Sequence, residues 1–182
     1  MIPFPDKKYE IIYADPAWQY QNGSVLPQSG LRLEEHGHYG TLSFSEMEAL
    51  PVSAIADENC LLFLWVISPD LKKCIEVGEA WGFEYKQIAF CWDKQRKVWG
   101  NYTFTQVELC LVFKKGSIPS PRGTSNEVQF LSVQRGEHSV KPLQVKARIQ
   151  RMFPTQSKIE LFARPGLLKY TDDGWDYWGN EV

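Results

Sequence analysis

The sequence lacks the long apolar runs of membrane-spanning and secreted proteins. No segment approaches the roughly 18 apolar residues of a membrane-spanning helix, and the opening MIPFPDKKYE contains no apolar signal segment. No C-x-x-C pair occurs, and the four cysteines lie in apolar stretches, at Cys60, Cys74, Cys91 and Cys110. This pattern indicates reduced core thiols and neither a disulfide framework nor a zinc site. We therefore expect a cytoplasmic protein without a membrane partner.

The sequence also lacks an excess of positive charge and several familiar motifs. Its formal net charge is −2, so it has no overall basic character that would favour nucleic acid. It contains no G-x-G-x-x-G, no Walker loop and no G-x-S-x-G. His36 and His38 lie two residues apart in a segment with Gly37 and Gly40, but no third ligand is near them in the sequence, so we predict no metal site.

The patterns that are present predict one α/β domain, residues 1–182. The chain is long enough for a real core, and 43% of its residues are apolar. Strand patterns occur at Tyr9–Ala14, Cys60–Ile67, Tyr85–Trp92, Val107–Phe113, Val128–Leu131 and Ile159–Ala163. Helical patterns alternate with them, at residues 43–50, 68–81 and 142–153, and the first of these opens with a predicted capping box, Ser43-Phe44-Ser45-Glu46. This alternation predicts a mostly parallel sheet.

Basic residues gather in the second half of the chain. Three stretches of the chain are predicted to be long loops, and two of them contain basic residues of this half: residues 19–39, 93–105 and 116–126. Seven basic residues and two acidic ones lie between Lys86 and Arg122. We expect the following to form a phosphate-binding rim: Lys94, Arg96, Lys97, Lys114, Lys115 and Arg122. Four more basic residues between Lys141 and Arg151 either join this rim or form the solvated face of a helix.

The segment Tyr13–Trp18, YADPAW, follows the first strand pattern. A proline has no N–H for the ladder of a central strand, so Pro16 ends the strand near Ala14. This leaves the Asp15 carboxylate at the carboxyl edge of the sheet, where open α/β sheets bind ligands, beside the ring of Trp18. The alternative is a plain turn, since Asp and Pro are common turn residues.

The order of several segments resembles the MT-A-seventy family of adenine amino-methyltransferases, most closely its compact bacterial and phage members. The tetrapeptide Asp15-Pro16-Ala17-Trp18 is similar to the family signature Asp-Pro-Pro-Trp. Further blocks follow in the family order: HYGTLSFSEMEALPV, CLLFLWVISP, AWGFEYKQIAFCWDK, ELCLVFKKG, GEHSVKPLQVKARIQRMFP, KIELFARPG and GWDYWGNE. The resemblance implies a Rossmann-like class I methyltransferase fold with helices on both faces of the sheet. It also implies a permuted order, with the catalytic motif before the cofactor strand, and S-adenosylmethionine as cofactor.

The chemistry of adenine methylation suits this signature. The exocyclic amine of adenine is a poor nucleophile because its lone pair is delocalised into the ring, so it helps to hold both N–H groups with acceptors. The resemblance assigns catalysis to Asp15, Pro16, Ala17 and Trp18. Asp15 supplies a carboxylate, Pro16 a carbonyl on a restrained backbone, and Trp18 a face for a base that is flipped out or single-stranded.

The resemblance implies further site residues. Tyr39, Trp65 and Trp92 match aromatic residues at the target-base pocket, although Trp65 and Trp92 equally suit core packing. Lys141 matches a lysine near substrate phosphate and cofactor, or is a surface lysine at a helix start. The following match cofactor-binding positions, as Asp15 does: Glu160, Leu161, Phe162, Arg164, Asn180 and Glu181. Without the resemblance, Glu160 and Arg164 would pass as an ion pair at the sheet edge.

The sequence departs from the family pattern in three respects. Ala17 replaces the second proline of the signature, which leaves the turn less stiff, so we expect weaker activity. Phe104 and Gln106 stand where many bacterial members carry Arg and Asn, which alters the expected nucleic-acid contact. We expect no separate target-recognition domain, so sequence specificity must come from the loops or from a partner subunit, or be low.

These observations lead to one predicted function and two alternatives. We expect methyl transfer from S-adenosylmethionine to adenine in bacterial or phage DNA, single- or double-stranded, as in restriction-modification. The first alternative is the same reaction on RNA. The second is an inactive nucleic-acid-binding scaffold subunit, against which the retained Asp15 and Trp18 argue. A homodimer or a partner subunit is compatible with each.

Overall fold

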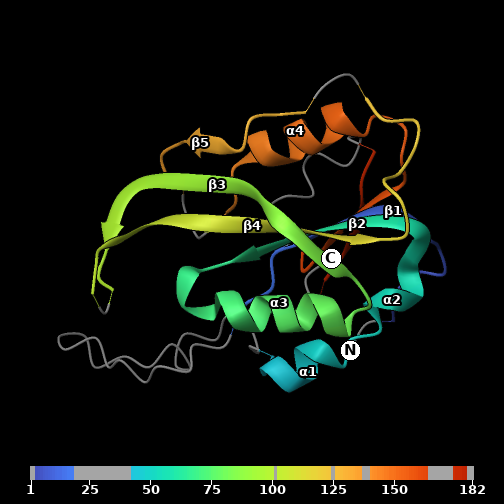
Figure 1. Cartoon of the computed structure of the whole chain (residues 1–182), viewed down its shortest axis with the longest axis horizontal. Coiled ribbons are helices and arrows are strands. Elements are labelled where there is room, and N and C mark those ends of the chain that lie inside the picture. The colour runs from blue at the N-terminus through green and yellow to red at the C-terminus, as the bar shows by residue number, and fades with distance from the viewer. Residues whose placement is uncertain are drawn as a thin grey trace.

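The computed structural model describes residues 3–18, 42–100, 102–123, 126–136, 140–163 and 174–179. This part of the chain forms one seven-stranded sheet with helices on both faces (Figure 1). The strands are β1 (Tyr9–Ala14), β2 (Ala56–Val66), β3 (Glu84–Val98), β4 (Thr105–Lys115), β5 (Phe130–Ser132), β6 (Lys158–Leu161) and β7 (Asp176–Trp178). The predicted α/β class is confirmed.

The sheet is mostly parallel, as predicted, with one reversed strand. Its order is β5-β3-β4-β2-β1-β6-β7. β1 is parallel to β2 and β6, β6 to β7, and β3 to β5, whereas β4 is antiparallel to both of its neighbours. β4 runs backwards because it is the return strand of a hairpin with β3. The other strands therefore end at one edge, and β4 begins at that same edge, which is where parallel sheets bind ligands.

The described helices begin and end at recognisable sequence signals. α1 (Phe44–Glu48) starts at the predicted capping box, in which the Ser43 N–H donates to the Glu46 carboxylate over 2.8 Å and the Glu46 N–H donates to the Ser43 hydroxyl over 3.3 Å. α3 (Leu71–Ala80) follows a 3-10 turn, η2 (Ser68–Asp70), and ends before Gly82, whose φ is +86°. The others are α2 (Val52–Ile55) and α4 (Leu143–Met152).

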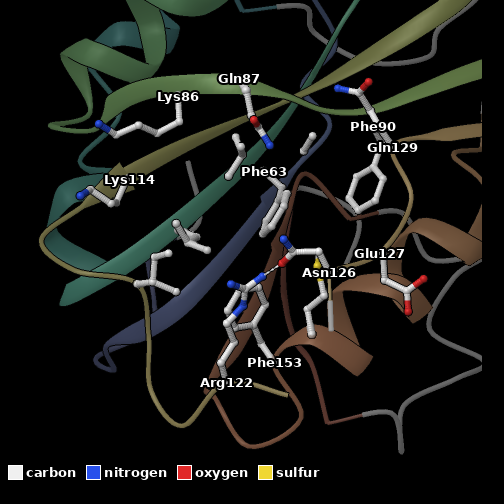
Figure 2. Close-up of a pocket in the computed structure, with 15 residues that line it drawn as sticks. Phe63, Lys86, Gln87, Phe90, Lys114, Arg122, Asn126, Glu127, Gln129 and Phe153 are labelled. Carbon is white, nitrogen blue, oxygen red and sulfur yellow. Dashed lines mark hydrogen bonds between the residues drawn. The ribbon is translucent and has the colours of Figure 1, made fainter. Parts of the chain in front are cut away.

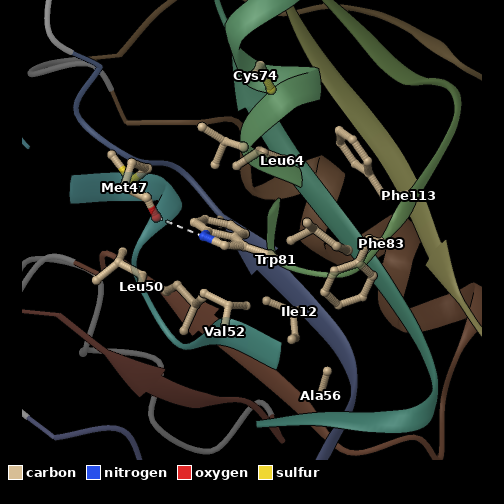
Figure 3. Close-up of a cluster of buried hydrophobic side chains, with 14 of the residues drawn as sticks. Ile12, Met47, Leu50, Val52, Ala56, Leu64, Cys74, Trp81, Phe83 and Phe113 are labelled. Carbon is tan, nitrogen blue, oxygen red and sulfur yellow. Dashed lines mark hydrogen bonds between the residues drawn. The ribbon is translucent and has the colours of Figure 1, made fainter. Parts of the chain in front are cut away.

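Two apolar clusters, one on each face of the sheet, anchor these helices. On the first face, α1 and α3 pack on β1, β2 and β4. Trp81 lies in that cluster, fully buried, and its indole N–H donates to the Met47 carbonyl over 2.8 Å (Figure 3). On the second face α4 contributes Val145, Ile149 and Met152. Because β2 is covered on both sides from Cys60 to Val66, that part of its sequence is apolar without alternation.

The structure differs from the sequence prediction mainly at β3 and β7. Residues 93–98 were predicted to be loop, but they continue β3, and Val98 pairs with Thr105 in β4. They carry no apolar alternation because residues 95–98 are exposed and the residues before them, Asp93 and Lys94, make polar contacts. β7 was missed because only three residues pair with β6. None of the helices in the described part of the chain has the length and hydropathy to span a bilayer.

The close approach of α3 to β4 gives a testable prediction at Gly78. A Cβ built there lies 2.3 Å from the ring atom Cε1 of Phe113, which is completely buried. Gly78→Ala should therefore destabilise the protein by about 1–3 kcal/mol in urea unfolding, because the ring must move within a packed core. The exposed neighbour Glu79→Ala, in the same helix, should change the free energy of unfolding by less than about 0.5 kcal/mol. A stabilised Gly78→Ala protein, as helix propensity alone predicts, would contradict this account.

Candidate active site

Asp15 lies where the sequence placed it, directly after β1. β1 is the buried strand between β2 and β6, so its carboxyl end opens at the centre of the sheet edge. The side chains of Tyr13 and Asp15 fall on the α4 face by the two-residue alternation of the strand, since Ile11 and Tyr13 belong to the cluster beneath α4. Pro16 is buried and Asp15 is partly exposed. The edge thus presents one accessible carboxylate on a restrained turn.

Four charged side chains form an alternating chain at this edge, Asp15–Lys141–Glu108–Lys94, which we call the ion chain. The Lys141 ammonium lies 2.8 Å from Asp15 Oδ1 and 2.9 Å from its Oδ2. It also lies 3.2 Å from Glu108 Oε2, and the Lys94 ammonium is 3.0 Å from Glu108 Oε1. The members come from the end of β1, the segment before α4, β4 and β3. Residues up to 126 positions apart in sequence are therefore brought into contact.

The ion chain favours the charged forms of its two central members, Glu108 and Lys141. Burial raises the pKa of Glu108, but the ammonium groups of Lys141 and Lys94 outweigh this effect, so the pKa of that carboxyl lies below its ordinary value. Burial likewise lowers the pKa of Lys141, whereas Asp15 and Glu108 outweigh it and raise the pKa overall. Two ammoniums and two carboxylates balance, so the site holds fixed charges with no net excess.

Aromatic side chains line the inner side of the ion chain. The Trp65 indole donates to the Tyr13 hydroxyl over 2.7 Å, and the Lys141 ammonium lies 5.5 Å from the centre of the Trp65 ring. Trp18 donates to the Trp65 carbonyl over 2.8 Å. This network connects Trp18, Trp65 and Tyr13 to one another, and Lys141 joins it to Asp15.

The predicted base-pocket aromatics differ in where they lie. Trp65 and Trp92 are 0% and 2% exposed and meet edge to face, with ring centres 6.2 Å apart. They belong to the apolar cluster on the α4 face, so the packing alternative describes their present environment. Trp18 is 8% exposed and stacks on Phe44 at 5.7 Å. Tyr39 lies outside the described residues.

The predicted cofactor strand reaches the same edge, but its carboxylate is engaged. Glu160 in β6 is 5% exposed and lies 2.8 Å from the Lys146 ammonium of α4. Lys146 also donates to the Tyr177 hydroxyl of β7 over 3.1 Å. Burial opposes the charge of Lys146, but Glu160 outweighs it and raises the pKa of this lysine.

The chain turns sharply after β6. Leu161 is fully buried, and Phe162 adopts a left-handed φ of +61°, which is unusual for a residue with a side chain. The turn is closed by the Ala163 N–H, which donates to the Trp178 carbonyl over 3.1 Å, so the end of β7 lies against the end of β6. Arg164, Asn180 and Glu181 lie outside the described residues.

The predicted phosphate-binding rim is divided between the two ends of the sheet. Arg96 and Lys97 are exposed on the hairpin beyond the active edge, and Lys94 is buried in the ion chain. Lys114 and Lys115 pair opposite Leu61 and Cys60, at the other end of β4.

A cavity of about 540 Å³ lies at that far end of the sheet, bordered by Lys114 and Arg122. Figure 2 shows the rings of Phe63, Phe90 and Phe153 lining it, with Arg122 donating to the Asn126 side-chain carbonyl. Lys114 and Arg122 therefore do not share a surface with the ion chain.

Sequence reasoning missed two members of the site, Glu108 and Lys146. Glu108 carried a signal, because it is the one acid inside an apolar strand and such a charge needs a partner. Lys146 carried little signal, since a buried lysine cannot be told from a solvated one among the four basic residues of a helix segment. Both depend on contacts that join distant parts of the chain.

The lowered pKa of Glu108 gives a prediction about stability and pH. A carboxyl whose folded-state pKa is lowered stabilises the fold above its unfolded pKa, and this contribution is lost as the pH falls through the folded value. Glu108→Gln should lower the free energy of unfolding by about 3 kcal/mol at neutral pH, because two buried ammoniums lose their shared partner. Its free energy of unfolding should then fall less steeply than the parent's below about pH 4.5.

Urea unfolding between neutral and acid pH measures both effects, with the exposed helix residue Glu79→Gln as the matched control. Parallel curves for parent and Glu108→Gln would show that Glu108 carries no such stabilisation.

Comparison with known proteins places this sequence in a family. The family model MT-A70, which is the MT-A-seventy family that the motifs resemble, matches residues 9–181. The chain is 44% identical over 190 residues to the Type II methyltransferase M.MunI of a Mycoplasma species, covering 98% of this chain and 79% of that protein.

Eukaryotic relatives are more distant and much longer. The chain is 30% identical to the N(6)-adenosine-methyltransferase MT-A70-like protein of Drosophila melanogaster, covering 96% of this chain and 27% of that protein. It is 28% identical to the human N(6)-adenosine-methyltransferase catalytic subunit METTL3, covering 96% and 28% respectively. Because the family model extends from the first residue of β1 to beyond β7, this chain belongs to the MT-A70 family of methyltransferases.

Proposed function

We propose that this methyltransferase transfers a methyl group from S-adenosylmethionine to the exocyclic amine of adenine in DNA. The observation that carries the proposal is the Asp15 carboxylate, partly exposed at the carboxyl edge of the sheet and held by Lys141 at 2.8 and 2.9 Å. The eukaryotic relatives are named N(6)-adenosine-methyltransferases, which supports the adenine amine as the target.

Within this proposal, Asp15 and Pro16 orient the adenine amine. A carboxylate offers about four lone-pair positions, so Asp15 has acceptor capacity left beside its contact with Lys141. The Pro16 carbonyl is a second acceptor on a backbone whose φ is restrained. Two acceptors hold the N–H groups and leave the nitrogen lone pair directed at the methyl donor. Ala17 leaves the turn less stiff than a second proline, and Trp18 closes the site on the side of Phe44.

The residues at the edge suit S-adenosylmethionine, which when bound supplies a methyl carbon on a positively charged sulfur. Asp15 provides a carboxylate for that positive charge. Glu160, Leu161 and Phe162 bring the end of β6 beside it, and the left-handed backbone of Phe162 turns the chain across the edge. A Cβ on Gly179 would lie 2.6 Å from the Ala163 carbonyl, so the two chain segments approach as closely as glycine allows. Arg164, Asn180 and Glu181 would complete the cofactor site.

DNA is the proposed substrate because a relative of which this chain spans 79% is named a Type II methyltransferase. Type II methyltransferases are the modification partners of restriction systems. We accordingly propose that residues 1–182 act as one catalytic domain in the cytoplasm of a bacterial cell. RNA is the second candidate, since other relatives are named adenosine methyltransferases.

The proposal is tested by transfer of radiolabelled methyl groups from S-adenosylmethionine to unmethylated DNA and RNA, followed by mass spectrometry of the nucleosides. We expect N6-methyladenine in DNA. Label confined to RNA would replace the proposed substrate, and label in a base other than adenine would overturn the assignment of the site. Absence of both label and cofactor binding would favour an inactive scaffold.

Asp15→Asn gives the sharpest prediction for the site. The substitution keeps the shape of the side chain but removes the charge that Lys141 and the proposed methyl donor face, so we expect the rate of methyl transfer to fall by about two to three orders of magnitude. The exposed Asp6→Asn is the matched control and should keep the parent rate. An Asp15→Asn protein that transfers methyl groups as fast as the parent would place the catalytic centre elsewhere.

A further inference from the structure

The β3–β4 hairpin extends past the active edge of the sheet. Figure 1 shows it projecting beyond the ends of the neighbouring strands. Asp93 fixes the base of this projection by accepting hydrogen bonds from the Gln95 backbone at 2.8 Å, from Gln106 at 2.7 Å and from Ser132 at 2.7 Å. Gln95 takes a left-handed φ of +54° there. The hairpin is therefore anchored where it leaves the sheet.

Three aromatic side chains at the end of the hairpin, Trp99, Tyr102 and Phe104, form what we call the aromatic tip. Their exposed fractions are 81%, 100% and 54%. Trp99 and Phe104 contact each other across the hairpin, with ring centres 4.9 Å apart and planes inclined by 56°. Single exposed apolar residues are ordinary, but three large exposed rings on one projection indicate a surface that binds another molecule.

The charge around the aromatic tip favours a polyanion as its occupant. From Lys94 to Phe104 the hairpin carries three basic residues and no acid. Arg96 and Lys97 are exposed on the strand that leads to the tip. Exposed rings beside cations are the combination that binds nucleic acid, since bases stack on the rings and phosphates meet the cations. An apolar protein partner would not require the cations.

The distance from the active site suits the same nucleic acid. Phe104 precedes Glu108 of the ion chain by four residues, which is about 13 Å of extended strand. Successive bases of a strand are about 3.4 Å apart, so this length corresponds to about four base steps. A strand whose adenine lies at Asp15 therefore needs only a few more nucleotides to reach the hairpin.

We propose that the aromatic tip stacks on bases that flank the target adenine and that Arg96 and Lys97 contact their phosphates. This proposal rests on the proposed function, because it assumes that nucleic acid reaches Asp15. It assigns to the hairpin a role in positioning the nucleic acid at the active edge. The chemistry of methyl transfer stays with the ion chain.

The experiment measures binding and methyl transfer for the full chain with Trp99→Leu, Tyr102→Leu and Arg96→Ala, using fluorescently labelled adenine-containing single strands and duplexes. Loss of one stacked ring should weaken binding by about five- to a hundredfold and raise KM similarly, with kcat little changed. The dependence of binding on salt should stay as in the parent for the ring variants and become shallower for Arg96→Ala, because only the latter loses a phosphate contact.

Phe130→Leu is the matched control, since Phe130 is also an exposed ring, on β5, at 57% exposure. Its binding should equal that of the parent. The unfolding midpoints of the tip variants should also match the parent, which separates lost contact from lost fold. In addition, a strand substituted with 5-iodouracil should cross-link on irradiation to the peptide that holds Trp99, Tyr102 and Phe104.

Two results would overturn the proposal while leaving the proposed function intact. One is a parent that methylates DNA and tip variants that bind and cross-link as the parent does. The other is tip variants that change only the oligomeric state in light scattering, which would make the tip a contact between two copies of the chain. A parent that neither binds nor methylates any nucleic acid would defeat both proposals together.

Discussion

The Lys141 ammonium, shared between Asp15 and Glu108, is the contact on which the site depends. It joins the end of β1 to β4 and to the segment that opens α4, three parts of the chain that have no other polar connection at this edge among the described residues. Its position over Trp65 ties the charged layer to the apolar cluster beneath. A partly exposed carboxylate is kept in one orientation because its partner is itself held at two further points. The accessible chemistry of Asp15 is thus a property of the packed core below it.

The reversed strand makes this arrangement possible. A parallel strand in the place of β4 would begin at the far edge and bring only its last residues to the site. Because β4 runs backwards, its early residues lie at the active edge, and Glu108 meets Lys94 of the preceding strand as well as Lys141. The same reversal produces the hairpin that projects beyond the edge. One topological feature therefore supplies both the inner charges and the outer surface.

Local sequence signals were sufficient for the strand that carries the catalytic motif and for the helix starts. β1 was predicted with its observed bounds, because a buried strand ended by proline is a strong local pattern. The capping box of α1 was predicted because it, too, is a local pattern that spans only a few residues. The Asp15–Lys141 contact was not predicted, because the family resemblance implied each residue as part of the site but gave no geometry for the pair. The sequence did not show that the basic residues of the predicted rim lie at opposite ends of the sheet. Some of them precede β4 and others end it or follow it, and this strand of 11 residues carries the two groups apart.

The ion chain also has a consequence for how the sheet assembles. Side chains alternate between the faces of a strand, so a pairing error of one residue between β3 and β4 would turn Glu108 toward the cluster beneath α3. There a carboxylate would meet apolar side chains, and the two lysines on the opposite face would lose their shared counter-charge. Apolar residues alone discriminate weakly between such alignments, since β4 is apolar on both sides over much of its length. The charges of the site therefore help to select one pairing register of β3 and β4, because a register shifted by one residue would bury Glu108 without a partner.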